Sequence, residues 1–304
     1  MFASFLRAFI TCLWHHALSK RQDYDLPIKP NFQTISTLGG PYSALNSTGQ
    51  THQIPKIFWI TMRNPPLHRH DMPVHIQKYL NIHPDWVPII ADDEQAHRFM
   101  TVVYANTSLL WAYERIHHRL GAARADIWRY AVLFACGGVY IDADATFNAQ
   151  LNSFIQPTDK FILSTERNNV RPCYTGKFRS VEEPAIFQNR IIVQWMLIAA
   201  PRHLFMYRTM VDVVTVVRSI HLGHAVLLPN TPPLMVILCT TGPLLLTNSI
   251  SKVITTAPVK SAGFRYVGQD YAPILGMFKA PGLKNGKSHY QQLMEKGIPM
   301  LGSL

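Results

Sequence analysis

The sequence predicts an α/β fold, on the evidence of three observations. Short apolar runs alternate with stretches of helical period, and Gly, Pro and Asn residues separate them. The chain has 304 residues, of which 48% are hydrophobic and 15% charged, so it can bury a full core. No internal repeat divides it. Ordered α/β structure is predicted to begin at residue 54.

The first 53 residues are predicted to lie outside this domain, as an N-terminal helix followed by a linker. The opening MFASFLRAFITCLWHHAL is apolar but is interrupted by Arg7, His15 and His16. Its longest apolar stretch is well short of the roughly 20 residues that a spanning helix needs. A helix on a membrane surface and an ordinary packed helix both stay open for it. Residues 21–53 are rich in Pro, Ser, Thr, Gly and Asn, and predict a loop or linker.

The 54–304 domain is predicted to open with a buried strand over residues 54–60, where Pro55 stands near the start and costs little. The next elements are a helix over 73–82, a strand over 86–91, and helices over 94–104 and 109–118. The central run 122–147 reads as a helix over 122–135, a strand over 139–141 and two aspartates. Gly137 and Gly138 allow the sharp turn between the helix and the strand.

The second half is predicted to continue this alternation. We expect a strand over 161–164, a polar loop over the site at 166–183, helix-compatible segments over 190–200 and 203–218, and a helix opening at Pro243. The tail from residue 271 reads as irregular. No segment after the N-terminus is predicted to span a membrane, because the apolar patches at 108–113 and 211–217 have the pattern of core.

Asp142 and Asp144 carry the clearest chemical signal. They follow a predicted strand, where open α/β sheets place their ligands, and their spacing of two puts them on one face. Two hard oxygen ligands suit Mg²⁺ or Mn²⁺ with a bound diphosphate. Asp126, Arg129 and Tyr130 share a face of the preceding helix. Asp126 and Arg129 are suited to hydrogen-bonding sugar hydroxyls, so the run can hold both parts of a sugar nucleotide.

This run resembles the DxD-containing sugar transferases typified by the fungal initiating α-1,6-mannosyltransferases and the mannosyltransferases of inositol phosphorylceramide. It is more distantly similar to the clostridial glucosylating toxins. The shared pattern is matched by Ala122, Asp126, Arg129, Tyr130, Gly137, Gly138, Tyr140, Asp142 and Asp144. Residues 54–60, 190–203 and 241–243 also resemble family segments, so the likeness covers roughly residues 54–250.

The resemblance implies a GT-A-type nucleotide-sugar transferase fold, with a Rossmann-like mixed sheet flanked by helices. It further implies a metal-dependent hexosyltransferase that retains the anomeric configuration and uses Mn²⁺ or Mg²⁺. GDP-mannose and UDP-sugars are the candidate donors, and mannose is favoured because of segment 190–203. The acceptor stays open between a glycan, a glycolipid and a protein. A eukaryotic chain would belong to a Golgi or secretory membrane; any other would be cytoplasmic or membrane-peripheral.

The resemblance also assigns site residues. Asp142 and Asp144 would hold the metal and diphosphate, with His289 as a third ligand, although no Gly-Ser-Trp-like motif follows it. The donor-binding residues are Trp59, Ile60, Asp126, Arg129, Tyr130 and Tyr140; those on the reacting face are Asn189 and Gln194. Structural alternatives stand beside these: the aromatic residues are also typical of core, and Asp126 with Arg129 is also typical of a surface pair.

Other functional classes are weighed against this prediction. Residues 139–146 also fit hhhDxDxT, the loop of haloacid-dehalogenase-like phosphatases, with Asp142 as nucleophile and Asp144 as general acid/base. That loop normally follows the first strand of its domain and needs a later acidic pair. A non-catalytic sugar-nucleotide or glycan-binding protein would have less need of the DxD. The net charge of +11 is scattered, so nucleic acid is not an expected partner, and the four cysteines form no CxxC metal or redox motif.

Overall fold

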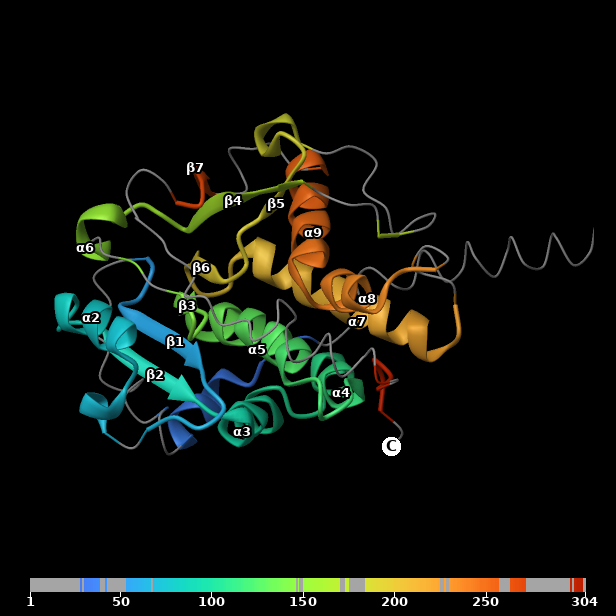
Figure 1. Cartoon of the computed structure of the whole chain (residues 1–304), viewed down its shortest axis with the longest axis horizontal. Helices are drawn as coiled ribbons and strands as arrows, with labels where there is room; N and C mark the ends of the chain where they lie inside the picture. The colour runs from blue at the N-terminus through green and yellow to red at the C-terminus, as the bar shows by residue number, and fades with distance from the viewer. Residues whose placement is uncertain are drawn as a thin grey trace, which may run out of the picture.

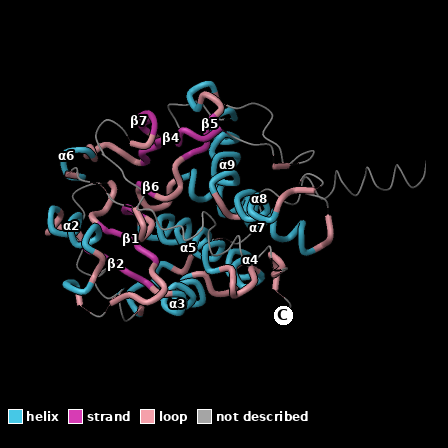
Figure 2. Tube along the Cα trace, in the orientation of Figure 1, coloured by secondary structure: helices cyan, strands magenta, loops and turns pink. Residues whose placement is uncertain are grey.

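The computed structural model describes residues 28, 30–38, 42, 53–66, 68–145, 147, 150–169, 173–174, 184–224, 227, 230–256, 263–271, 296 and 298–302. Figures 1 and 2 show the arrangement of its elements. The helices and helical turns are η1 (Phe32–Thr37), η3 (Arg69–Asp71), α2 (Val74–Ile82), α3 (Asp93–Val103), α4 (Ser108–Arg115), α5 (Gly121–Cys136), α6 (Leu151–Phe154), η5 (Ala185–Phe187), α7 (Leu204–His221), α8 (Pro233–Thr240) and α9 (Pro243–Thr256). The strands are β1 (Ile57–Thr61), β2 (Val87–Ala91), β3 (Gly138–Ile141), β4 (Phe161–Asn169), β5 (Arg190–Ile192), β6 (Met196–Ala199) and β7 (Arg265–Gln269).

Within the described residues these strands form a seven-stranded sheet in the order β2-β1-β3-β6-β4-β5, with β7 paired to β4. β1 runs parallel to both β2 and β3, whereas β6 is antiparallel to β3 and to β4. The sheet is therefore mixed, with helices packed on it (Figure 1), which confirms the predicted α/β class. Because the chain passes from β1 to β2 on one side and later to β3 on the other, the carboxyl ends of β1 and β3 form a topological switch point.

Both faces of the sheet are buried, and alternate residues of β1 show this. Ile57 and Trp59 join the larger core cluster, together with residues of α3, α4, α5, α7 and α9. Phe58 and Ile60 join a smaller cluster with residues of α2 and α6. The period-2 alternation of a strand distributes its side chains in this way. Helix α2 therefore covers one face of the parallel strands and α5 the other.

Two glycines shape the connection from α5 to β3, as predicted. Gly137 and Gly138 have φ of +69° and +106°, in the region that disfavours other residues. A Cβ on Gly137 would lie 2.7 Å from Pro201, and one on Gly138 would lie 2.7 Å from the carbonyl oxygen of Ile57. Side chains at these positions would displace β3 from β1. The glycines therefore place Asp142 at the end of the sheet.

The prediction of a helix over 190–200 is wrong, since this segment forms β5 and β6. Its residues are apolar and largely buried, and a short apolar run cannot be assigned to helix or strand by periodicity. Pairing of β6 with both β3 and β4 decides the matter, because it satisfies the backbone of the segment in the sheet. Residues 21–53 also contain more structure than predicted, with η1 in the middle and Leu38 and Tyr42 in the main core.

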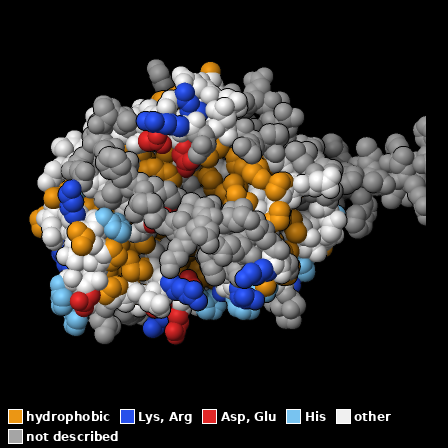
Figure 3. Space-filling view, viewed as in Figure 1, with side chains coloured by type: hydrophobic (Ala, Val, Ile, Leu, Met, Phe, Trp, Pro, Cys, Tyr) orange, Lys and Arg blue, Asp and Glu red, His pale blue; other side chains and the backbone are white. Residues whose placement is uncertain are grey.

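The charge of the protein is distributed rather than concentrated on the face shown in Figure 3. There, Lys and Arg side chains form separate groups, with hydrophobic side chains exposed between them.

One stretch of the described residues, Pro233–Thr256, is long and apolar enough to cross a membrane by length and composition alone, but 67% of an 18-residue apolar segment within it is buried inside the protein. Thr241 and Gly242 divide this stretch into α8 and α9. It has the character of a core element.

A disulfide between Cys173 and Cys239 joins the segment after β4 to helix α8. The two cysteines are 66 residues apart in sequence, with β5, β6 and α7 between them. The Tyr174 hydroxyl also donates to the carbonyl oxygen of Cys239 (2.5 Å). Spacing could not reveal this pairing, because the cysteines match no short motif. The disulfide therefore closes a long loop of the chain that contains β5, β6 and α7.

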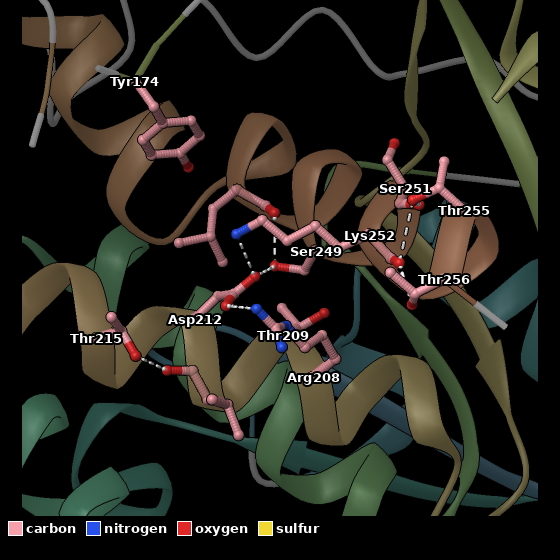
Figure 4. A network of polar contacts seen from close by, with 12 residues as sticks. Tyr174, Arg208, Thr209, Asp212, Thr215, Ser249, Ser251, Lys252, Thr255 and Thr256 are labelled. Carbon is pink, nitrogen blue, oxygen red and sulfur yellow. Dashed lines mark hydrogen bonds and ion pairs between the residues drawn. The ribbon is translucent and has the colours of Figure 1, made fainter. Parts of the chain in front are cut away.

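Asp212 on α7 holds α9 against the main core through a buried polar network (Figure 4). Its carboxylate accepts from Ser249 Oγ at 2.8 Å and lies 3.0 Å from Arg208 Nη2 and 3.3 Å from Lys252 Nζ. A buried carboxylate needs such partners to offset its desolvation. The network therefore orients α9, whose start lies next to Thr241.

Opening the disulfide should destabilise the fold. Removing a cross-link that closes a long loop costs about 2–4 kcal/mol, because the unfolded chain regains conformational freedom. We expect Cys239→Ser to lower the free energy of unfolding by that amount and to abolish its sensitivity to dithiothreitol, measured by urea denaturation. The control Cys136→Ala should stay sensitive to dithiothreitol. Equal stability of the wild type with and without reductant would contradict the role given to this bond.

Replacing Asp212 by Ala should also be costly. The variant loses the acceptor for Ser249 and leaves two cations without their partner, but Arg208 and Lys252 are partly exposed and regain water. We therefore expect a loss of about 2 kcal/mol, below the cost of breaking a fully buried pair. Asp85→Ala, which breaks an exposed pair with Lys56, should cost under ~1 kcal/mol in the same urea titration. Similar losses for both variants would argue against the Asp212 network.

Candidate active site

The DxD lies in a tight turn at the carboxyl end of β3. The Asp142 amide donates to the carbonyl oxygen of Trp195 (2.8 Å), which ties the turn to the start of β6. The Ala145 amide donates to the carbonyl oxygen of Asp142 (3.0 Å), which closes the turn over residues 142–145. Asp142 and Asp144 are both half-buried. The two carboxylates therefore stand at the switch point of the sheet, partly open to solvent.

The Asp142 carboxylate is oriented by two side chains from the sheet and from α5. Its Oδ1 accepts from the Tyr140 hydroxyl (2.8 Å) and lies 3.3 Å from Arg129 Nη2. The Tyr140 hydroxyl also lies 3.2 Å from Thr61 Oγ1, at the carboxyl end of β1. Tyr140 and Asp142 are two residues apart, so the extended chain places both on one face.

Arg129 is a buried cation shared by two acids. Its Nη2 lies 3.0 Å from Asp126 Oδ1, one helical turn earlier, as well as 3.3 Å from Asp142. Its Nη1 donates to the backbone carbonyl of Gln194 (3.1 Å), and its guanidinium lies 4.4 Å above the Tyr140 ring. Charge-assisted hydrogen bonds and the ring face together offset the burial of the charge.

A second layer of hydrogen bonds joins α5 to the start of α9. The Thr241 hydroxyl donates to Asp126 Oδ2 (2.9 Å), and the Tyr130 hydroxyl donates to the backbone carbonyl of Thr241 (2.8 Å). Gln194 Nε2 donates to the Tyr130 hydroxyl (2.5 Å). These residues come from α5, from the loop between β5 and β6, and from the α8–α9 turn. The network thus brings together segments more than 100 residues apart in sequence.

Burial sets the protonation of this network. It raises the pKa of Asp126 to about 7, against the opposing attraction of Arg129 and the Thr241 hydrogen bond. For Arg129, burial alone would lower the pKa, but the summed effect of Tyr140, Asp142 and Asp126 is larger and raises it. Arg129 is therefore a cation at every working pH, and the Asp126 carboxyl titrates near neutrality.

Most of the predicted site residues meet in this place. The network contains six of them, from three parts of the chain: Asp126, Arg129, Tyr130, Tyr140, Asp142 and Gln194. Asp144 belongs to the same turn. Asn189 lies apart from the network, exposed and with φ +59°, on the turn before β5. His289 lies outside the described residues, so its predicted metal ligation stays a prediction.

Trp59 and Ile60, which are predicted to bind the donor, are both core side chains in the structure. Trp59 is fully buried, and its indole N–H donates to the carbonyl oxygen of Gly137 (2.7 Å), at the opposite end of β3 from Asp142. Ile60 is fully buried in the smaller core cluster. Both faces of this parallel strand are covered, so the side chains that alternate along it are core.

Sequence reasoning missed two residues that contact this site. The Thr241 hydroxyl donates to Asp126, but Thr241 is not among the predicted site residues; the likeness of residues 241–243 to a family segment was the available signal. His75 on α2 donates from Nε2 to the carbonyl oxygen of Ala143 (2.7 Å), between the two aspartates. No motif singled out His75, because its contact spans 68 residues.

The two aspartates fit a divalent cation that also binds a substrate. Carboxylate oxygens are the ligands that Mg²⁺ and Mn²⁺ prefer. The described residues contain no group of three or more His, Cys, Asp or Glu side chains that could hold a metal. Mg²⁺ is commonly held by one or two carboxylates, with substrate phosphates and water completing its shell. The donor set thus matches a cation carried with a phosphorylated ligand.

Part of the sequence is similar to a family of known proteins. Residues 70–161 match the glycosyltransferase sugar-binding region containing the DXD motif. The chain is 27% identical over 163 residues to the initiation-specific alpha-1,6-mannosyltransferase of Schizosaccharomyces pombe, covering 49% of this chain and 37% of that one. It is 35% identical over 96 residues to the mannosyl phosphorylinositol ceramide synthase of Saccharomyces cerevisiae, covering 30% and 22%. The alignments thus span less than half of either relative.

Two solved structures are also similar. The PaToxG Glycosyltransferase has a TM-score of 0.40 at 16% identity, with 75% of this chain and 77% of that chain covered. The UDP-bound glycosyltransferase domain of the YGT toxin has a TM-score of 0.36 at 12% identity, with 64% and 55% covered. Both scores are low, so they carry no weight for function. The matched residues 70–161 contain α5, both aspartates and the turn between them, so in this region the chain is similar in sequence to the DXD-containing glycosyltransferases and to the two mannosyl-transferring relatives.

Proposed function

We propose that this protein transfers a hexose from a nucleotide-sugar donor with the help of Mn²⁺ or Mg²⁺. The observation that carries the proposal is the buried Arg129, which holds Asp142 and Asp126 together at the switch point of the sheet. Asp142 is a ligand for a cation with a diphosphate, and Asp126 is an acceptor for sugar hydroxyls. The Arg129 guanidinium therefore sets the distance between the two carboxylates, and so between the two halves of the proposed donor site.

Asp142 and Asp144 would hold the metal and, through it, the donor diphosphate. A metal ion held by these carboxylates would neutralise the diphosphate and so stabilise it as a leaving group. Tyr140 contributes by donating to one oxygen of Asp142, which keeps the carboxylate in a single orientation. Arg129 would add a fixed positive charge near the leaving group, and its own side chain is shielded from water.

Asp126 and Arg129 would bind the donor sugar, and Thr241 and Gln194 would support them. The Thr241 hydroxyl and the Arg129 guanidinium hold the Asp126 carboxylate from two sides. Gln194 joins Tyr130 and Arg129, so its placement on the reacting face is compatible with the geometry. Asn189 keeps the role of a second candidate there. We assign no nucleophile to the retaining reaction.

The donor and acceptor are proposed in order of support. Mannose, carried as GDP-mannose, is favoured because both curated relatives are named for mannosyl transfer. A UDP-sugar is the alternative donor. The acceptor is a glycan, a glycolipid or a protein. The Cys173–Cys239 disulfide favours an oxidising compartment such as the secretory lumen.

The phosphatase alternative has less support. Its nucleophile loop normally follows the first strand of the domain, but β1 and β2 both precede β3 here. Two of the later acids are committed elsewhere among the described residues: Asp212 pairs with Arg208 and Lys252, and Asp270 pairs with Arg167. They are therefore poorly placed as a second acidic pair beside Asp142.

Donor hydrolysis tests the proposal directly. The purified protein is offered a panel of GDP- and UDP-sugars with Mn²⁺, and release of free sugar is measured. We expect cleavage of one donor, abolished by EDTA and reduced at least 100-fold in Asp144→Asn, because one of two carboxylate ligands becomes a weaker amide.

The matched control is Asp71→Asn, an exposed aspartate outside the site, which should cleave at the wild-type rate. Circular dichroism and urea denaturation should show that Asp144→Asn keeps its fold. Full activity in Asp144→Asn would refute the metal assignment. Absence of both cleavage and metal-dependent donor binding in the wild type would refute the proposed function.

The raised pKa of Asp126 predicts a pH-dependent stability. The unfolded carboxyl titrates near pH 4 and the folded one near 7, so the folded state binds an extra proton between these values. Its contribution to stability is full below about pH 4 and is lost as the pH rises through about 7. We therefore expect the stability of the wild type relative to Asp126→Asn to fall by roughly 3 kcal/mol between pH 4.5 and 7.5.

This difference is measured by urea denaturation of both proteins across that range. Comparison of the two proteins at each pH cancels the groups that they share. Asp71→Asn, whose aspartate is exposed, serves as the control and should show no such trend. A difference between wild type and Asp126→Asn that stays constant with pH would rule out the buried titration.

A further inference from the structure

We propose that His75 is a positioning residue that holds the turn of Asp142 and Asp144 in the conformation that receives the metal and the donor diphosphate. The proposal rests on the proposed function and adds a residue to it. His75 lies in the first turn of α2, which covers the face of the sheet with the smaller core cluster, and it is half-buried. Its Nε2 donates to the carbonyl oxygen of Ala143 at 2.7 Å.

The hydrogen bond from His75 acts in the middle of the turn, where it can restrain the orientation of Asp144. The Ala143 carbonyl belongs to the peptide plane that leads into Asp144, so fixing that oxygen fixes the plane and the direction of the Asp144 Cα. The two backbone bonds of the turn act elsewhere: the Asp142 amide is bound to Trp195, and the Ala145 amide to Asp142. His75 therefore restrains the middle of the turn, between the two carboxylates.

Helix α2 is packed into the core and can therefore serve as the support. It buries Ile76, Tyr79 and Leu80 in the smaller core cluster. The Tyr79 ring stacks on Phe147 just beyond the turn, with centroids 5.0 Å apart and planes at 16°. A side chain anchored on a packed helix holds its partner more precisely than one on a loop does. The hydrogen bond from His75 thus transmits the position of α2 to the DxD.

Helix α2 also contacts the chain further along, at the start of α6. His83, which caps α2, is buried, and its Nδ1 lies 2.7 Å from the Tyr79 carbonyl oxygen. Its Nε2 accepts from the Leu151 amide (2.8 Å) at the start of α6. Burial lowers the pKa of His83, in agreement with a neutral ring that donates from Nδ1 and accepts at Nε2. Residues 143 and 151 are therefore bound to two ends of one helix.

The two histidines have different consequences. His83 lies in the core and acts on the fold, whereas His75 contacts the turn that carries the metal ligands. In metal sites, the partners that orient the ligands are worth about 10–100-fold in affinity. We expect His75→Ala to weaken binding of Mn²⁺ with a nucleoside diphosphate by about tenfold while the urea midpoint shifts little.

Three variants separate positioning from simple loss of a side chain. In Gln the amide nitrogen is as many bonds from Cβ as Nε2 is in His, so His75→Gln keeps a donor near the Ala143 carbonyl. In His75→Asn the donor is one bond shorter and cannot reach. His75→Ala removes it. Lys78→Ala, an exposed change on the same helix, is the control and should behave as the wild type.

Two measurements are made on each variant. Isothermal titration calorimetry with Mn²⁺ plus GDP or UDP reports affinity. Hydrogen exchange of the peptide covering residues 139–147, without ligand, reports protection of the turn. We expect weaker binding and about tenfold faster exchange of the Ala145 amide in the Ala and Asn variants, with both near wild type in His75→Gln.

Wild-type affinity and protection in His75→Ala would overturn the proposal, as would a Gln variant no better than Ala. The exchange measurement also separates this proposal from the proposed function. If the wild type binds neither nucleotide but the exchange pattern holds, then the transferase function fails while His75 still holds the turn. If binding occurs but exchange and affinity ignore residue 75, then the positioning role fails alone.

Discussion

The buried guanidinium of Arg129 is the interaction on which the rest of the site depends. Removing its charge from water costs several kcal/mol, which the two carboxylates, the Gln194 carbonyl and the Tyr140 ring together offset. Without Arg129, Asp126 and Asp142 would be two acids in one poorly solvated space. The arrangement of α5 against β3 is therefore tied to the arrangement of charge, and a change in either would alter both.

The mixed sheet supplies the parts that surround this cation. The parallel strands bring Asp142 and Thr61 to one edge, and the antiparallel β6 places Trp195 and Gln194 beside them. Thr241 arrives from the other side of the core, at the α8–α9 turn. The disulfide and the Asp212 network both act on this last segment, because Cys239 is two residues from Thr241 and Asp212 holds α9. Two long-range restraints thus stabilise a part of the site that no local pattern specifies.

The residues around the two aspartates come from helices on both faces of the sheet. Helix α5 covers the face with the larger core cluster and carries Asp126, Arg129 and Tyr130, whose buried network we propose to bind the donor sugar. Helix α2 covers the face with the smaller core cluster, and its His75 contacts the turn of the two aspartates. A donor that bridges these groups would be held from both layers of the protein. Contacts from both layers would make two carboxylates in a short turn a preorganised site rather than a solvated loop.

The sequence by itself determined the central unit, because helix α5, the two glycines, β3 and the DxD are contiguous and each follows from local physical chemistry. The helical face of Asp126 and Arg129 and the extended face of Tyr140 and Asp142 required no knowledge of the fold. Only the tertiary structure decided that Trp59 is core, that residues 190–200 form two strands, that Cys173 pairs with Cys239, and that Thr241 and His75 reach the site. These features depend on contacts between segments dozens of residues apart, or on which face of a doubly covered strand a side chain takes. Periodicity and motif spacing cannot supply that information, because they describe only the neighbourhood of each residue along the chain.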